Sequence, residues 1–262
     1  MILKIISKVK ISVDTGQEVN FARDFCIIRG KLGRCNDPNF NAEEIFMKCE
    51  SLQKFGGVSV IAGALLLAAY SILFMLILPV SEVRRDITIA VMNPAWVWIA
   101  LTAFAGVVFI IFGLITVYSR ISASSGLLGL TGFVVVEFAY MLQACKVTWE
   151  IFIYPVISAN QSFAPLLRDS IFQHSPQVVM FRTAASAAIF IGITLFCLAL
   201  VRSDRFPKAG GILIFAGALL YGFGPMLSVI AAISGILIHA AGFFILGLKL
   251  IRNDANVIAA EM

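Results

Sequence analysis

Long apolar runs, separated by short polar segments, dominate the chain from residue 55 onward. A helix needs about 20 apolar residues to cross the hydrocarbon core of a bilayer, and each run reaches or approaches that length. The runs also lack the two-residue alternation of barrel strands. They predict six transmembrane helices, over residues 55–80, 95–118, 127–154, 183–201, 206–223 and 226–251.

The last two helices come from a single apolar region. No charged residue occurs from Ala209 to Leu248. A straight helix of that length would extend roughly 60 Å, twice the thickness of the hydrocarbon core, so the chain must turn within it. Residues 222–225, with the sequence Gly-Phe-Gly-Pro, predict the position of that turn.

Residues 1–54 differ in composition, because they are polar and carry many charges. Residues 8–14 alternate as a strand does, and residues 42–54 have the pattern of a short helix. A segment of about fifty residues rarely builds its own core, so we expect a disordered or two-stranded cytoplasmic extension. The change of composition beside Met47 also gives the hypothesis that Met47 is the physiological start. Whichever start is used, the predicted transmembrane domain spans residues 55–252, and residues 253–262 form a short tail.

Composition leads to the same fold class. Apolar residues make up 60% of the chain, charged residues only 13%, and the mean hydropathy is +0.95. Soluble domains carry about 25% charged residues. A water-soluble fold could not bury so much apolar surface, and in lipid the backbone polar groups must be paired within helices. We therefore expect an all-α, polytopic integral membrane bundle whose surroundings are the lipid bilayer.

The basic residues orient this bundle. The net charge of +5 does not indicate nucleic-acid binding, because the basic residues flank the apolar runs instead of forming a stripe. With both termini in the cytoplasm, fifteen of the twenty lie on the cytoplasmic side, as the positive-inside rule favours. Nothing beyond the sequon at residues 160–162 indicates a eukaryotic secretory route. The expected location is the cytoplasmic (inner) membrane of a prokaryote.

Enzyme and cofactor motifs are missing from the sequence. The five cysteines match no zinc spacing, and two histidines, His174 and His239, offer no matched pair for a haem. The sequence contains no nucleophile elbow, no HExxH motif and no Walker lysine motif. We expect no metal and no cofactor, and we favour a protein that is not an enzyme, although an intramembrane enzyme stays open.

Three polar residues near the bilayer midplane form the first candidate site. Glu137 lies ten positions into the third helix, and His239 lies ten positions before Lys249 at the end of the sixth. At about 1.5 Å per residue, both reach a similar depth of roughly 15 Å. We predict that they lie close together and share a proton, with Tyr140 adding a hydrogen bond. The alternative is that each residue has a separate structural partner.

A second polar cluster is predicted at the outer end of the third helix. Gln143, Lys146 and Glu150 share one face of that helix, and the last two have the i,i+4 spacing of an ion pair. The functional interpretation is the entrance of a polar cavity. The structural interpretation is an interfacial ion pair with the lysine extending toward water.

Small residues line several helices, for instance Gly56, Ser59 and Gly63, or Ala232, Gly235 and Gly242. Such faces let helices approach closely, and they could bind a membrane-protein partner or a second copy of the chain. The sequence therefore favours a non-catalytic membrane subunit or an assembly or interaction protein. The alternative function is a small proton-coupled carrier that uses Glu137 and His239.

Overall fold

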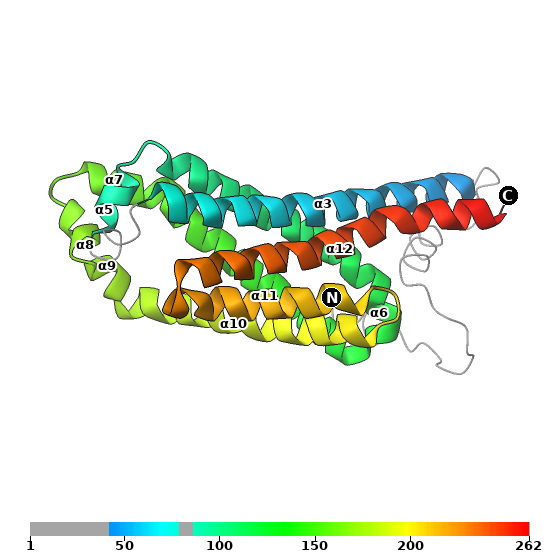
Figure 1. Ribbon diagram of the computed structural model, residues 1–262. Coiled ribbons are helices and arrows are strands. Elements are labelled where there is room, and N and C mark those ends of the chain that lie inside the picture. The colour runs from blue at the N-terminus through cyan, green and yellow to red at the C-terminus, as the bar shows by residue number, and fades with distance from the viewer. Residues whose placement is uncertain (1–41, 79–85, 262) are drawn as a thin grey trace, which may run out of the picture.

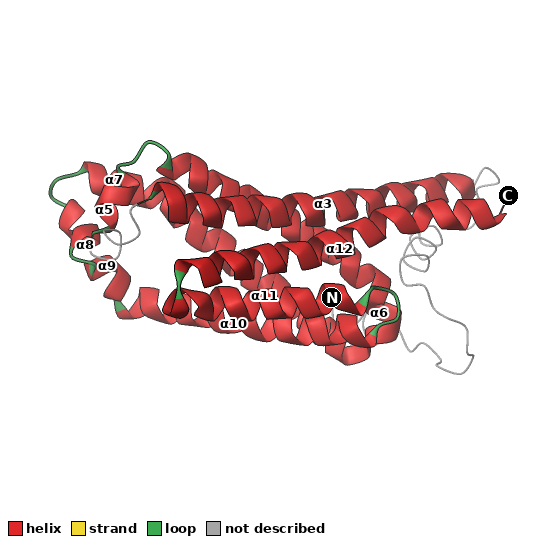
Figure 2. Cartoon of the chain, viewed as in Figure 1, coloured by secondary structure: helices red, strands yellow, loops and turns green. Residues whose placement is uncertain are grey.

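The computed structural model describes residues 42–78 and 86–261, with side chains described within 51–252. The predicted strand pattern and most of the N-terminal extension lie outside these residues. The described part is helical throughout and contains no strand, which confirms the all-α fold (Figures 1 and 2). The long helices are α3 (Ala42–Ile77), α6 (Trp96–Thr148), α10 (Pro176–Arg202), α11 (Lys208–Leu227) and α12 (Val229–Glu261).

Short helices gather at one end of the bundle. They are α5 (Ile87–Val91), the π-helical turn η1 (Trp149–Ile153), α7 (Tyr154–Ala159), α8 (Ala164–Arg168) and α9 (Ile171–His174). In Figure 1, α5 and α7–α9 lie at the left, beyond the ends of the long helices. We call this the Trp96 end.

Within the described residues, five candidate spans are long and apolar enough to cross a membrane, and one of them covers 64 residues, Trp96–Ala159. A straight helix of that length would extend roughly 96 Å, about three bilayer cores. The chain instead turns back at Gly126, where φ is 53° and ψ is −148°. Ala100 and Ala103 consequently pack against Val147 and Ile151 from the far end of the same span. The five candidates therefore comprise six long helical segments.

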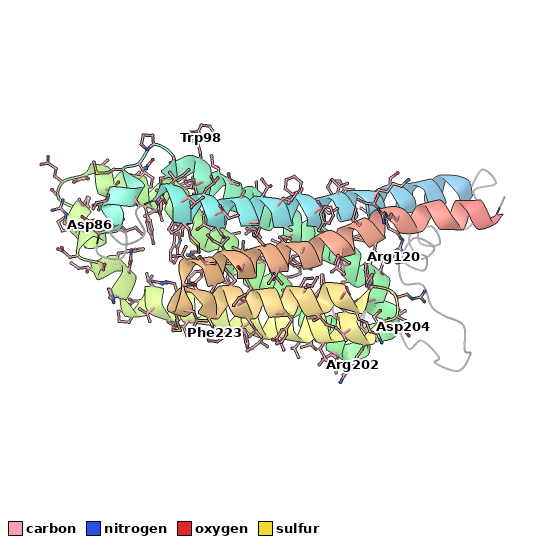
Figure 3. The ribbon with its side chains drawn as sticks, in the orientation of Figure 1. Asp86, Trp98, Arg120, Arg202, Asp204 and Phe223 are labelled. Carbon is pink, nitrogen blue, oxygen red and sulfur yellow. The ribbon has the colours of Figure 1, made fainter. Side chains whose placement is uncertain are left out.

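Charged residues mark the two ends of the bundle. In Figure 3, Arg120, Arg202 and Asp204 lie at the right, whereas Asp86 lies at the left, beside α5. We call the right-hand end the Gly126 end. Between the two ends the outer faces of the helices are lined by exposed apolar side chains such as Phe112 and Phe190. This distribution is what a helical bundle in lipid requires.

The six segments form three hairpins, and the same type of glycine contact recurs in each. The hairpins are α3 with the first half of α6, the second half of α6 with α10, and α11 with α12. In each hairpin, a glycine on either helix faces the backbone nitrogen of the residue four positions after its partner glycine. A Cβ atom on Gly192, for example, would lie only 2.6 Å from the nitrogen of Val136. The three glycine pairs are Gly63 with Gly106, Gly132 with Gly192, and Gly217 with Gly235.

The hairpins also pack against one another. Helix α12 lies along α3, where Gly57 and Gly247 approach each other, and α10 lies along α11. One apolar core runs through all three hairpins, with Leu114, Leu200 and Leu246 among its fully buried members. The two small-residue faces named above are thus used inside the chain: Gly63 packs on Ile110, and Gly242 on Ile214, for example.

The turn between the last two helices was placed wrongly by the sequence. Helix α11 continues through Pro225 to Leu227, and the break comes at Ser228. The Ser228 side chain accepts a 3.0 Å hydrogen bond from the backbone N–H of Ala231, so it caps α12. Pro225 is tolerated because it lies in the last turn of α11 and removes only one hydrogen bond there.

The predicted short helix over residues 42–54 is also longer than expected. It is continuous with the first span, and both belong to α3.

Candidate functional site

A cavity of about 330 Å³ lies at the Trp96 end. Its volume falls near the lower limit of small-molecule sites, which are about 300–1,000 Å³. Side chains from all three hairpins line it, together with residues of α5 and α9. The lining residues are Tyr70, Ser71, Phe74, Met75, Ile87, Trp96, Lys146, Trp149, Glu150, Tyr154, Gln173, Val178, Arg182, Tyr221 and Pro225.

The ion pair predicted on the third helix forms part of this lining. Lys146 Nζ lies 3.4 Å from Glu150 Oε1, and the side chain of Glu150 is only 9% exposed. The third member of the predicted cluster, Gln143, is half-buried and does not line the cavity. The structure therefore brings Lys146 and Glu150 to a cavity and leaves Gln143 outside it.

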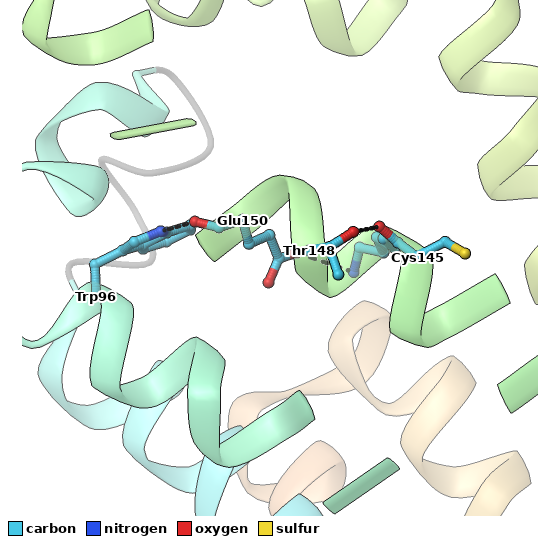
Figure 4. Close-up of polar contacts among 5 residues, drawn as sticks. Trp96, Cys145, Thr148 and Glu150 are labelled. Atoms are coloured by element: carbon cyan, nitrogen blue, oxygen red, sulfur yellow. Dashed lines mark hydrogen bonds and ion pairs between the residues drawn. The ribbon is translucent and has the colours of Figure 1, made fainter. Parts of the chain in front are cut away.

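A π-helical turn holds Glu150 in place. The N–H of Tyr154 donates to the carbonyl of Trp149, five positions back, and Pro155 has no N–H to offer. The carbonyl of Glu150 is left to accept a hydrogen bond from elsewhere, and Trp96 Nε1 supplies it at 2.7 Å (Figure 4). Single π-helical turns of this kind occur frequently at functional sites.

Two further polar groups, from other helices, line the same cavity. Tyr70 of α3 lies close enough to Glu150 to interact with it electrostatically. Arg182 of α10 lies close enough to Tyr154 to interact with it electrostatically. The sequence analysis missed both residues. Tyr70 lies within an apolar span that has no other distinguishing feature, and Arg182 has the position of a charge that flanks the fourth predicted span. Only the packing of three helices brings them together.

Aromatic rings form most of the remaining wall. Phe74 lies 6.1 Å from Trp96, and Trp96 stacks on Tyr154 at 6.4 Å between ring centroids. Outside them, Phe172 of α9 contacts both Tyr154 and Trp149. Such ring contacts contribute about 0.5–1.5 kcal/mol each beyond area burial, so this wall is well defined.

The short helices are fixed over this end by polar contacts. Asp86 caps α5 by accepting a 2.9 Å hydrogen bond from the N–H of Thr88. The same carboxylate lies 3.7 Å from Nε of Arg168 on α8. Leu167, fully buried in the same region, packs in the cluster that contains Trp96 and Tyr154. Residues of α5 and α8 thus support the cavity wall.

The predicted proximity of the midplane residues stays a prediction, and their hydrogen bonds are as follows. His239 Nδ1 lies 2.8 Å from the carbonyl oxygen of Ile214, and its ring meets Phe243 edge-on. Both carboxyl oxygens of Glu137 are buried and have no hydrogen-bond partner among the described residues. Tyr140 lies near Glu137 and Cys197. The described part of the chain therefore contains no direct hydrogen bond between Glu137 and His239.

Within the described residues, no group of three His, Cys, Asp or Glu side chains could hold a metal ion. The fold and the cavity define a multi-pass helical membrane protein with a cavity of small-molecule size. Comparison with known proteins finds no matching family, no similar curated protein and no similar solved structure.

Proposed function

We propose that this chain is a non-catalytic membrane protein that binds a small ligand in the cavity at the Trp96 end. The observation that carries the proposal is the cavity itself, which receives side chains from all three hairpins. An apolar wall with a few convergent polar groups is typical of binding sites. Glu150 forms an ion pair with Lys146, which suits a structural and recognition role better than acid–base catalysis. Binding of this kind fits a membrane subunit or an interaction protein.

A cavity-filling variant tests this function. Ser71 is buried in the lining, so Ser71→Leu adds volume inside the cavity, whereas Ser186→Leu adds the same volume on an exposed face of α10. Small molecules that co-purify with the protein are extracted and identified by mass spectrometry. We expect one to be present with the unsubstituted chain and with Ser186→Leu, and lost with Ser71→Leu. Equal recovery from all three proteins would exclude the cavity as the binding site.

We also propose that the six helical segments cross the inner membrane of a prokaryote with both termini in the cytoplasm. Support comes from the basic residues at the Gly126 end, which include Arg120, Arg202, Arg205, Lys208 and Arg252. Reporter fusions after Arg252 and within residues 160–170 test the topology. A reporter active outside the cytoplasm when fused after Arg252 would contradict it.

A proton-coupled carrier is the second candidate, because the buried carboxyl of Glu137 lacks a partner in the described structure. An intramembrane ionisable residue suggests transport or proton transfer by default. Against it, Glu137 and His239 are absent from the lining of the cavity. Proton uptake in proteoliposomes that depends on Glu137, and is lost in Glu137→Gln, would favour the carrier over the binding protein.

A further inference from the structure

We infer that the ligand of this cavity is a small amphipathic anion, whose carboxylate or phosphate group is bound by Arg182 and Lys146 and whose apolar body packs on the aromatic wall. The inference rests on the proposed binding function and adds the chemical class of the ligand. Three properties of the lining carry it: its charge, its hydrogen-bond donors and its aromatic surface.

The charge of the lining is unbalanced. Among the residues that the structure describes, it contains two cations, Lys146 and Arg182, and one carboxylate, Glu150. Lys146 lies 3.4 Å from Glu150 and compensates it, whereas Arg182 forms no ion pair within the part of the chain that the structure describes. Arg182 is exposed, so its charge stays available to a ligand that enters the cavity. One negative charge on the ligand would balance the charges of the described lining residues.

The hydrogen-bonding groups of the lining have the same preference. Besides the two cations, it offers the amide of Gln173, the hydroxyl of Ser71 and the hydroxyls of three tyrosines. The carboxylate of Glu150 is already engaged by Lys146. Carboxylates and phosphates only accept hydrogen bonds, and charge-assisted bonds to Arg are the strong ones. A donor-rich site with an occupied carboxylate therefore selects an anion.

A cationic ligand is the main competitor, because aromatic faces also bind cations. The lining supplies Trp96, Trp149 and three tyrosines for such an interaction. A cation would, however, have to approach both Arg182 and Lys146. Like charges repel each other, so we assign the aromatic wall to the apolar body of an anion. The position of the cavity, at one end of an apolar bundle, suits such an amphipathic molecule.

The test uses the full chain in nanodiscs of zwitterionic lipid and three probes with the same ten-carbon chain: decanoate, decanol and decyltrimethylammonium. Binding is followed by tryptophan fluorescence. We expect decanoate to bind at least about tenfold more tightly than decanol, as the loss of a charge-assisted contact implies. Arg182→Gln removes this advantage, Arg182→Lys keeps most of it, and the matched variant Arg202→Gln, altered at the Gly126 end, leaves it unchanged.

The outcomes separate the inference from the proposed function. Tightest binding of decyltrimethylammonium, abolished by Ser71→Leu, would overturn the anion and leave the cavity as a binding site. Decanoate binding that Arg182→Gln does not change would also overturn the inference. If no probe responds to Ser71→Leu, the proposed function fails together with it. Nanodiscs containing phosphatidate identify the source: competition with decanoate supports a membrane lipid, and its absence supports a free amphipathic anion.

Discussion

Trp96 Nε1 donates a 2.7 Å hydrogen bond to the backbone carbonyl of Glu150, which lies 54 positions later in the chain. The bond joins the first turn of α6 to the π-helical turn that follows it. It closes the hairpin at the end opposite Gly126, and both residues line the cavity. One contact therefore holds the fold and the candidate site together.

Trp96→Phe is expected to destabilise the protein. Phenylalanine preserves the aromatic contacts but leaves the buried carbonyl of Glu150 without its donor, which costs about 1–3 kcal/mol. Unfolding in mixed detergent micelles, followed by helical circular dichroism, measures the change. Trp98→Phe is the matched control, because Trp98 is 72% exposed and should change the stability by less than about 0.5 kcal/mol. Equal effects of the two substitutions would refute a special role for the Trp96 bond.

The missing N–H of Pro155 gives a sharper test of the same contact. In Pro155→Ala the new backbone N–H can donate to the carbonyl of Glu150, so the carbonyl no longer depends on Trp96. We expect Trp96→Phe to cost at least about 1 kcal/mol less in that background, a coupling within the usual range for residues that share a partner. Strictly additive effects would show that Pro155 does not leave the carbonyl free.

Gly126→Ala is expected to weaken the α6 hairpin without any steric clash. No atom lies within 4 Å of a Cβ at this position, but φ is +53°, which side-chain-bearing residues rarely adopt. The backbone strain should cost about 1–3 kcal/mol. Gly222→Ala is the control, because it is also unobstructed and lies in a regular helix, where alanine is favoured by about 1 kcal/mol. If both variants unfold at the same denaturant concentration, Gly126 is not needed for the reversal.

The fold could be predicted from the sequence to the extent that lipid determines it. Apolar run lengths indicated long helices, and the all-α bundle is confirmed. The turn near Ser228 was missed because the Gly-Phe-Gly-Pro segment reads as a break, whereas Gly224 is a helical contact point against Ala232. A glycine that breaks a helix and one that packs against a neighbour look alike in the sequence. The two kinds of glycine can be distinguished only when the position of the neighbouring helix is known.

The candidate site was predictable only where its residues are close in sequence. The i,i+4 spacing located Lys146 and Glu150, because one helix fixes their geometry. Arg182 and Tyr70 come from two other helices, and their approach depends on which helices are neighbours. The same limit applies to Glu137 and His239. Residue counting gives their depth in the bilayer but not the helix that each side chain faces, and His239 lies against Ile214 of α11.

Gly192→Ala is expected to push α6 and α10 apart. The added Cβ would lie 2.6 Å from the backbone nitrogen of Val136, and a backbone atom in a packed helix cannot move aside as a flexible side chain can. Overpacking of this kind costs about 1–3 kcal/mol. Because the same contact recurs in the other hairpins, Gly217→Ala should behave similarly. Thermal unfolding in detergent checks both, and a stability equal to that of Gly222→Ala would contradict the close contact.

Glu137→Leu is expected to make the protein more stable. Both oxygens of this carboxyl are buried without a partner among the described residues, so they lose the hydrogen bonds that water would give them. An apolar side chain of similar size removes that loss, worth about 1–3 kcal/mol. Glu137→Gln is the control, because its amide is equally polar and should leave the stability nearly unchanged.

The two variants of Glu137 also separate the candidate functions. A loss of stability in Glu137→Leu would show that the carboxyl has a stabilising partner, contrary to the structure. A gain of stability with ligand binding and proton flux unchanged would favour the binding protein, since the cavity lining does not include Glu137. A gain of stability in Glu137→Leu, together with loss of proton uptake in both variants, would favour the carrier. In that case Glu137 would be needed for proton transfer, because leucine would give a more stable protein at this position.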